Sequence, residues 1–285
     1  MIGVIARQSR NIICMPTMTT TDSLPGIAKA DLIAGMAKGM AVLESFDTER
    51  QRLNATLAAQ RAGITRAAAR RHLLTLAYLG YLETDGSYYW LSSKVLRFSG
   101  SYLASARMPR VLQPTLNRLA AQTQESFSAV VLDGHEVVIV ARSGNDWRSS
   151  PSGKAQVLAY GLHLGARLPA HATSTGRLLL AALPKPALSA WIKAQPLRRL
   201  TAHTVTDTKA LRQSIDAARR QDFFLASEEH ELGVQALAVP LRNVQGDTVA
   251  ALNVVAAPHR WTPHALQTEL LPVLQDAARE LRPLL

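Results

Sequence analysis

The sequence predicts two domains, a small helical domain closed by a β-hairpin and a larger α+β domain with an antiparallel sheet. Three observations lead to this fold class. Two short helical segments meet at Gly63, the runs 81–84 and 88–91 flank a turn, and strands and helices mix from Ser126 onward. At 285 residues, with 47% hydrophobic and 19% charged residues, the chain can bury two cores.

Residues 1–30 show no sustained hydrophobic periodicity and are expected to form a flexible N-terminal tail. The first apolar residues are too few for a signal peptide, and no later stretch reaches the roughly 20 apolar residues of a membrane-spanning helix. The single cysteine, Cys14, excludes an intramolecular disulfide and a cysteine-based zinc site. We therefore expect a soluble cytoplasmic protein that has no membrane partner.

The charge balance favours a polyanionic partner. The chain has 32 lysines and arginines against 21 acidic residues, which gives a formal net charge of +11. Nucleic acid and an anionic membrane surface would both suit such a protein. Many basic proteins have neither partner, so the choice depends on how the charges are arranged along the chain.

Residues 31–93 are predicted to form the smaller domain. A helix with apolar residues at helical spacing covers 32–46, and a second helix covers 54–61. Gly63 suits the left-handed conformation that ends one helix before the next begins. The third helix opens at Thr65, whose hydroxyl can cap the free N–H groups of its first turn.

The third helix has the composition of a DNA recognition helix, with an apolar face, a cationic front and small residues between the charges. Arg66, Arg70 and Arg71 lie off the apolar stripe, near the N-terminal end of the helix. Such arginines can bind guanine bidentately, with about 1–3 kcal/mol of discrimination, or hold phosphates without reading sequence. Asn54 and Thr56 either contact the DNA backbone or only cap their helix. The predicted DNA-binding residues are Asn54, Thr56, Thr65, Arg66, Ala67, Arg70 and Arg71.

Two aromatic and β-branched runs, 81–84 and 88–91, flank the turn residues Asp85, Gly86 and Ser87. This pattern predicts a β-hairpin. A hairpin directly after a recognition helix is the wing of a winged helix-turn-helix. The expected role of a wing is to contact phosphate or the minor groove. The alternative is that the hairpin only covers the small core. The sequence therefore predicts a domain that binds double-stranded DNA.

Residues 94–108 are predicted to form a linker helix that Pro109 interrupts, and residues 109–285 form the larger domain. That domain opens with a helix over 111–122. Alternating apolar runs, glycines and prolines define the elements that follow. Strands are predicted over 127–132, 136–141, 155–160, 223–226, 235–241 and 248–255, and helices over 173–183, 187–193, 208–221 and 263–281.

Three stretches, 39–46 with the helix pair after it, 165–177 and 228–240, resemble the IclR family of bacterial transcriptional regulators. The resemblance covers the chain from about residue 34 to its C-terminus. It implies a winged helix-turn-helix joined to an effector-binding domain similar to the GAF fold. It also implies a homodimer or homotetramer on a roughly palindromic operator, because two-fold protein symmetry sets the spacing of half-sites.

The recognition helix and the loop 169–176 look most similar to the branch of this family that controls aromatic-acid catabolism. That similarity implies a small aromatic carboxylate as effector, with 4-hydroxybenzoate expected. Protocatechuate, β-ketoadipate or another aromatic acid are the alternatives. The implied output is activation of the gene for 4-hydroxybenzoate hydroxylation, and an activator would have RNA polymerase as a partner. Repression is the alternative. Effector binding is expected to act through the linker helix.

In the family, the effector pocket lies between the sheet and the segment that matches 169–176. Carried over position by position, the resemblance implies that small and hydroxyl-bearing side chains line it. Ala226 and Ala236 replace polar residues of glyoxylate-responsive relatives, which widens the pocket and makes it more apolar, as an aromatic ring requires. The implied lining residues are Tyr160, Ser174, Thr175, Ala226, Val234 and Ala236.

A buried aromatic carboxylate also needs a hydrogen-bond donor or a cation. Arg142, at the end of its strand, and His171 are the candidates, helped by Thr173 and Ser174 at a helix start that favours anions. Two alternatives stay open. An acidic residue, Glu228 or Glu229, pairs with the arginine, or the histidine is only a satisfied loop residue.

Several signals of enzymatic function are absent from the sequence. It has no phosphate-binding P-loop, no Gly-x-Ser-x-Gly elbow and no His-Glu-x-x-His pair. His230 lies among acidic residues, but such a run is more typical of a solvated surface than of a metal site. We expect no catalytic residue, metal or cofactor, and no enzyme. The competing classes are an enzyme domain with a DNA-binding appendage and an architectural DNA binder that responds to no small molecule.

Overall fold

The computed structural model describes residues 28, 30–47, 50–143, 162–194 and 196–285. The chain divides into two compact units, 1–102 and 103–285, and each is considered by itself. Most of the predicted N-terminal tail and the predicted strand 155–160 lie outside the described residues. In the described part of the chain, every helix is too short or too polar to cross a membrane.

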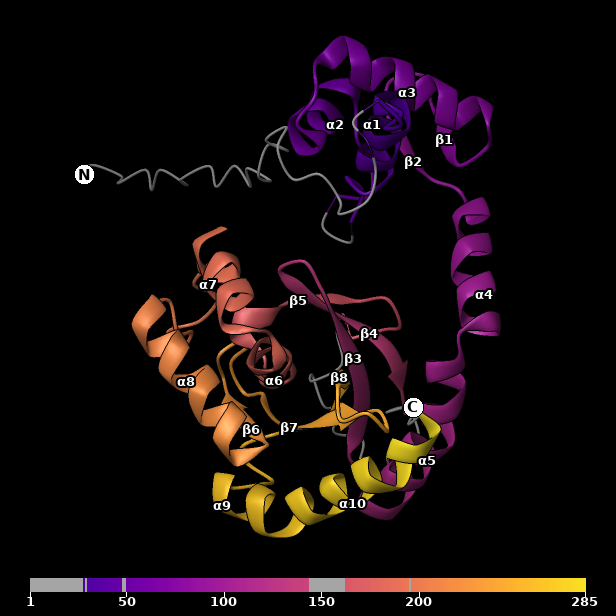
Figure 1. The fold of residues 1–285 in the computed structure, drawn as a ribbon. Helices are drawn as coiled ribbons and strands as arrows, with labels where there is room; N and C mark the ends of the chain where they lie inside the picture. The colour runs from indigo at the N-terminus through magenta and orange to yellow at the C-terminus, as the bar shows by residue number, and fades with distance from the viewer. Residues whose placement is uncertain (1–27, 29, 48–49, 144–161, 195) are drawn as a thin grey trace, which may run out of the picture. The chain divides into compact units, whose positions relative to one another are not determined.

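The first unit is a three-helix domain with a hairpin and the start of a linker helix (Figure 1). Its hairpin pairs Leu82 with Leu91 and Thr84 with Tyr89. Leu53 exchanges two backbone hydrogen bonds with Tyr89, at 3.0 and 2.8 Å, and so ties the hairpin to the helices. The elements are α1 (Ala34–Leu43), α2 (Ala55–Ala62), α3 (Arg66–Tyr78), β1 (Leu82–Thr84), β2 (Tyr89–Leu91), a 3₁₀ turn (Ser93–Val95) and α4 (Leu96–Ser105).

Capping residues fix the turn between α2 and α3. Asn54 Oδ1 accepts hydrogen bonds from two backbone N–H groups of the first turn of α2, at 3.1 and 3.0 Å. Gly63 ends α2 with φ at 64°, a backbone conformation that side chains other than glycine rarely adopt. Thr65 Oγ1 accepts from the N–H of Ala68 at 3.3 Å and caps α3. The helix-turn-helix with its β-hairpin is confirmed.

The second unit is an α+β domain, and its described residues form one six-stranded antiparallel sheet in the order β5-β4-β3-β8-β7-β6. The predicted fold class is confirmed. Its elements are α5 (Arg107–Thr123), β3 (Ser126–Asp133), β4 (Glu136–Arg142), β5 (Arg167–Pro169), a 3₁₀ turn (Ala170–Ala172), α6 (Ser174–Ala182), α7 (Lys185–Ala194), α8 (Thr208–Gln221), β6 (Phe224–Ser227), β7 (Gln235–Arg242), β8 (Thr248–Ala256), α9 (Pro263–Ala265), a π turn (Leu266–Leu270), α10 (Leu271–Leu281) and a 3₁₀ turn (Arg282–Leu284).

Helices cover both faces of this sheet (Figure 1). Because side chains alternate along a strand, neighbouring residues pack into different layers. Phe127 of β3 and Leu252 of β8 pack in the core that α5 and α10 complete. Val130 and Ala251 face the other way and pack in the core that α6, α7 and α8 complete. The effector pocket is expected on this second face.

The structure departs from the predicted elements at three prolines. Strand β5 was not predicted, because it has only three residues and ends at Pro169. Pro109 does not break a helix but lies in the first turn of α5, where a missing N–H costs little. The helix predicted over 263–281 is instead two helices joined by a π turn, and Pro272 stands in the first turn of the second.

Candidate functional site

Helix α3 presents the arrangement that the sequence predicts for DNA contact. Its apolar stripe is buried, with Ala69 and Leu73 fully covered. Arg66, Arg70 and Arg71 are exposed, and none of them forms an ion pair with a residue that the structure describes. Ala67, Thr56 and Thr65 are exposed as well, while Asn54 is half-buried and is used as a cap.

The turn of the wing is held by an acidic residue. The Asp85 carboxylate accepts hydrogen bonds from the backbone N–H groups of Tyr88 and Ser87, at 2.8 and 3.0 Å. It also lies 3.0 Å from the guanidinium of Arg52, which stacks on Trp90 with its central carbon 4.2 Å from the ring centroid. The two N–H groups, and then Arg52, keep the pKa of Asp85 below its ordinary value. Arg52 was not among the predicted DNA-binding residues.

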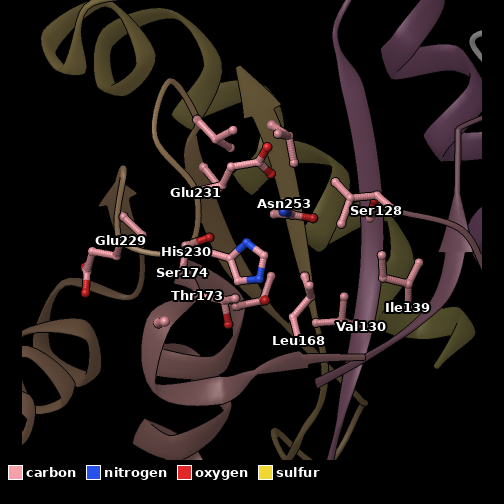
Figure 2. A pocket seen from close by; sticks show the side chains of 17 residues that line it. Ser128, Val130, Ile139, Leu168, Thr173, Ser174, Glu229, His230, Glu231 and Asn253 are labelled. Carbon is pink, nitrogen blue, oxygen red and sulfur yellow. The ribbon is translucent and has the colours of Figure 1, made fainter. Parts of the chain in front are cut away.

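A cavity lies in the second unit between the sheet and the start of α6 (Figure 2). The segment 229–234, between β6 and β7, forms a further part of its wall. Six of the nine residues predicted to bind the effector line it, whereas Arg142 and His171 do not, and Tyr160 lies outside the described residues. The six are Thr173, Ser174, Thr175, Ala226, Val234 and Ala236.

The cavity walls are mainly apolar. Val130 and Ile139 line it from the sheet, and Leu168 lines it from β5 (Figure 2). Ala226 and Ala236 stand directly opposite each other on β6 and β7. Two methyl groups at this pair leave more room than polar side chains would. Apolar walls with small side chains suit a flat aromatic ring.

The start of α6 supplies hydrogen-bond donors to the cavity. Thr173 caps the helix, since its Oγ1 accepts from the N–H of Gly176 at 3.1 Å. The first backbone bond of the helix runs from Arg177 N to Thr173 O, at 3.1 Å. The N–H groups of Ser174 and Thr175 therefore precede the hydrogen-bonded part of the helix. Such N–H groups, at the positive end of a helix dipole, favour an anion.

Two side chains of the cavity wall carry buried polar atoms without a partner. Ser174 is 1% exposed, and its Oγ has no hydrogen-bond partner among the residues that the structure describes. Asn253 is 8% exposed, and its Oδ1 likewise has no partner in the described part of the chain. A buried polar atom left unpaired costs about 1–3 kcal/mol, so a ligand that paired with both atoms would recover this cost.

Arg142 lies near this cavity without lining it. It stands directly opposite Ser128 across β3 and β4, so its side chain leaves the sheet on the cavity face. Burial lowers the pKa of Arg142, although an arginine keeps its charge in proteins. Among the described residues, neither acidic alternative forms an ion pair with Arg142: Glu229 pairs with Arg177, and Glu228 accepts from the N–H of Gly233 at 2.8 Å.

His171 is enclosed instead of facing the cavity. It is 3% exposed, and its Nε2 lies 2.9 Å from the carbonyl oxygen of Arg198. Burial is the main reason why the pKa of His171 is lowered. This geometry matches the alternative of a satisfied loop histidine.

Five polar residues of the cavity wall are not among the predicted effector-binding residues. The acidic run was interpreted as a solvated surface, but Glu229 is buried and His230 is half-buried, with its pKa lowered by burial. Both line the cavity. Glu231, Ser128 and Asn253 complete the polar part of the wall. The asparagine, flanked by apolar residues in the middle of its strand, was the available signal. Among the described residues, no group of histidine, cysteine or acidic side chains is placed to hold a metal.

Both units match models of known protein families. The model of the bacterial transcriptional regulator IclR C-terminal domain matches residues 100–282, and the model of the IclR helix-turn-helix domain matches residues 35–86. A p-hydroxybenzoate hydroxylase transcriptional activator from Acinetobacter baylyi is 52% identical over 90% of this chain and 93% of its own length. The Pca operon regulatory protein of the same organism is 51% identical over 91% of both chains.

Two solved structures are similar to the chain. One is the inducer-binding domain of a PobR double mutant from Acinetobacter with 3-hydroxybenzoic acid. It is 49% identical, covers 62% of this chain and 98% of its own, and has a TM-score of 0.57. The other is an IclR homologue from Microbacterium hydrocarbonoxydans with 4-hydroxybenzoate. It is 26% identical, covers 87% of this chain and 98% of its own, and has a TM-score of 0.64. The predicted family is confirmed: the chain belongs to the IclR family of bacterial transcriptional regulators.

Proposed function

We propose that this regulator binds 4-hydroxybenzoate in the cavity beside α6 and, in response, activates genes of 4-hydroxybenzoate catabolism. The observation that carries the proposal is an apolar cavity whose wall holds the unpaired polar atoms of Ser174 and Asn253 next to a helix start. An aromatic carboxylate is a ligand of this kind, with a flat apolar body and polar ends.

Donors at the start of α6 hold the carboxylate in this proposal. Thr173, Ser174 and Thr175 come from that helix start, and the apolar and small residues described above enclose the ring. Arg142 contributes its positive charge from the position next to Ser128 on the sheet. His171 acts only by holding the loop in front of α6, through its contact with Arg198. Tyr160 stays a proposed contact that the described residues do not include.

Two relatives of nearly equal identity regulate different genes. A relative at 52% identity is an activator of p-hydroxybenzoate hydroxylase, and one at 51% regulates the Pca operon. The complex of an IclR homologue with 4-hydroxybenzoate supports the first. Protocatechuate and β-ketoadipate are therefore the ligands to compare. A repressor in place of an activator is the alternative output, and an activator would also contact RNA polymerase.

DNA binding is proposed to use α3 with the wing, on an operator with two half-sites. The residues are those predicted from the sequence, with Arg66, Arg70 and Arg71 as the cationic front. A homodimer or homotetramer would place two such helices on one duplex. Ile33, Met36 and Met40 support self-association, because they form an exposed apolar stripe along α1, at 66%, 66% and 49% exposure.

Two measurements on the full chain test the proposal. Thermal unfolding is followed with 4-hydroxybenzoate, protocatechuate, β-ketoadipate and benzoate. A ligand at about 100 times its Kd stabilises the folded state by about 2.7 kcal/mol. DNA selected by the protein from a random duplex pool is then titrated with and without the stabilising acid. No stabilisation by any of the acids would overturn the effector assignment. An operator affinity that no acid changes would favour an architectural DNA binder.

A further inference from the structure

Polar side chains reach the cavity from three places: the start of α6, the sheet, and the segment 229–234, which supplies Glu229, His230 and Glu231. Thr173, Ser174 and Thr175 come from the start of α6, whereas Ser128 and Asn253 come from neighbouring strands of the sheet (Figure 2). The latter two stand directly opposite each other on β3 and β8, so their side chains share the cavity face. The segment 229–234 is thus one polar part of the wall, and the start of α6 and the Ser128–Asn253 pair are two further, separate sites.

These two sites differ in electrostatic character. The start of α6 offers N–H groups at the positive end of a helix dipole, and this site suits a carboxylate. Ser128 and Asn253 carry no charge, but each can both donate and accept a hydrogen bond. A neutral hydroxyl group, which also donates and accepts, is the complement of such a pair. Arg142 stands beyond Ser128 on the next strand and is absent from the cavity wall.

From this difference we infer that the Ser128–Asn253 pair recognises the ring hydroxyl of the effector and so determines the preference for hydroxylated over plain aromatic acids. The inference rests on the proposed function, since it assigns the second polar group of that ligand. Of the two residues, Asn253 contributes more to the recognition of the ring hydroxyl. The residue is more than nine-tenths buried, its Oδ1 has no partner among the described residues, and rotation of the amide by 180° offers either a donor or an acceptor.

A structural role does not explain Asn253. It lies in the middle of β8, where its neighbours Leu252 and Val254 are fully buried apolar residues. A buried amide oxygen without a partner lowers stability at such a place, and an apolar residue of similar size would remove that cost. Asn253 therefore opposes the stability of the free protein. Natural proteins keep such costs mainly at sites that bind a ligand.

The test is a comparison of two ligands on two proteins. The affinities of the full chain for 4-hydroxybenzoate and for benzoate are measured by isothermal titration, with the wild type and with Asn253→Leu. We expect the wild type to prefer the hydroxylated acid by about tenfold or more, because a lost buried hydrogen bond has this order of effect. In Asn253→Leu the preference should fall below about threefold, while the affinity for benzoate and the Tm of the free protein stay the same or rise.

Matched variants separate the possible failures. Ser174→Ala, at the carboxylate site, should weaken both acids by the same factor and leave their ratio unchanged. Ser128→Ala, which keeps Asn253, should also reduce the ratio of the affinities for 4-hydroxybenzoate and benzoate. If Asn253→Leu keeps the wild-type ratio of the two affinities, the inference is overturned, and His230 is the next polar group of the wall to test. If Asn253→Leu weakens both acids equally, Asn253 binds the carboxylate and the inference is wrong. If the wild type binds neither acid, the proposed function itself fails.

Discussion

Arg177 and Glu229 form a buried ion pair that joins helix α6 to the segment 229–234 of the cavity wall, with Nη2 and Oε2 2.6 Å apart. The arginine side chain is 1% exposed and also donates to the carbonyl of His171 and to Ser214 Oγ, at 2.8 and 2.7 Å. Thr204 Oγ1 donates to the backbone carbonyl of Glu229 at 2.7 Å. The two walls of the cavity are therefore fixed to each other by one satisfied charge network.

Replacing Glu229 by glutamine should destabilise the second unit by about 3–5 kcal/mol, because a buried arginine would lose its counter-charge. Burial already lowers the pKa of Arg177, which reflects how strongly this environment disfavours the charge. Urea unfolding of the full chain measures the loss. The matched control is Glu280→Gln, whose partner Arg118 is exposed and whose pair should contribute 0–1 kcal/mol. Similar losses from both variants would contradict the assigned role of the buried pair.

Gly176→Ala should also destabilise the chain, by about 1–3 kcal/mol or more. A Cβ at this position would lie 2.1 Å from the carbonyl oxygen of Ala170, and backbone atoms cannot move aside as a flexible side chain can. Gly100→Ala is the control. It lies inside α4 with no atom within 4 Å of the added methyl group, and alanine favours a helix over glycine by up to about 1 kcal/mol. Thermal unfolding compares the two, and equal Tm values for both variants would refute the close approach.

Local signals were sufficient to predict most of this fold. Caps at Asn54 and Thr65 and a glycine between them define the helix pair, and the turn at Asp85 defines the hairpin. Helix α8 has the bounds that its periodicity indicates. Strand β5 was missed because three residues ending at a proline carry almost no pattern, and only pairing with β4 makes them a strand.

The site was less predictable, because its contacts join distant parts of the chain. The resemblance implied a shared pocket wall for the start of α6, Ala226 and Ala236, and the structure brings them together around one cavity. It could not show that Ser128 and Asn253 meet, since sheet order brings β3 beside β8. It could not show either that Glu229 turns inward to a buried arginine 52 residues away in the sequence. From the sequence alone, the acidic run 228–231 is typical of a solvated surface, because the partner of Glu229, Arg177, is distant in the chain.

Stability should fall as the pH drops below about 6.5, the ordinary pKa of histidine. Burial lowers the pKa of His171 in the folded state, against the hydrogen bond to the carbonyl of Arg198. Below pH 6.5 this histidine therefore binds a proton in the unfolded chain but stays neutral in the folded chain. The contribution of His171 to the free energy of unfolding is complete only above that pH and is lost as the pH falls. His171→Gln should make the pH dependence of the unfolding free energy shallower between about pH 5 and 7. His230 and His135 act in the same direction, so part of the slope should persist.

Arg142→Gln should weaken 4-hydroxybenzoate binding several-fold without changing the Tm of the free protein. The arginine makes no ion pair with any residue that the structure describes, and it stands next to Ser128 on the cavity face of the sheet. Its charge attracts an anionic ligand through partly buried surroundings, where screening is weak. Isothermal titration measures the change, with Arg219→Gln on α8 as a control of equal charge. An affinity equal to that of the wild type would remove Arg142 from the site.

Arg70→Ala should weaken operator binding, and the form of the loss identifies what Arg70 contacts. If Arg70 binds a guanine, affinity falls by about 1–3 kcal/mol and discrimination disappears at one base pair of each half-site. If it binds a phosphate, all sequences weaken alike and the slope of log K against log salt becomes shallower by about one. Titrations at three salt concentrations, on the selected operator and on single-base variants, separate these results. Arg220→Ala, exposed on α8 in the other unit, is the control of equal charge. Equal affinities for wild type and Arg70→Ala at every salt concentration would exclude Arg70 from the DNA interface, and Arg66 and Arg71 would then be the cations to test.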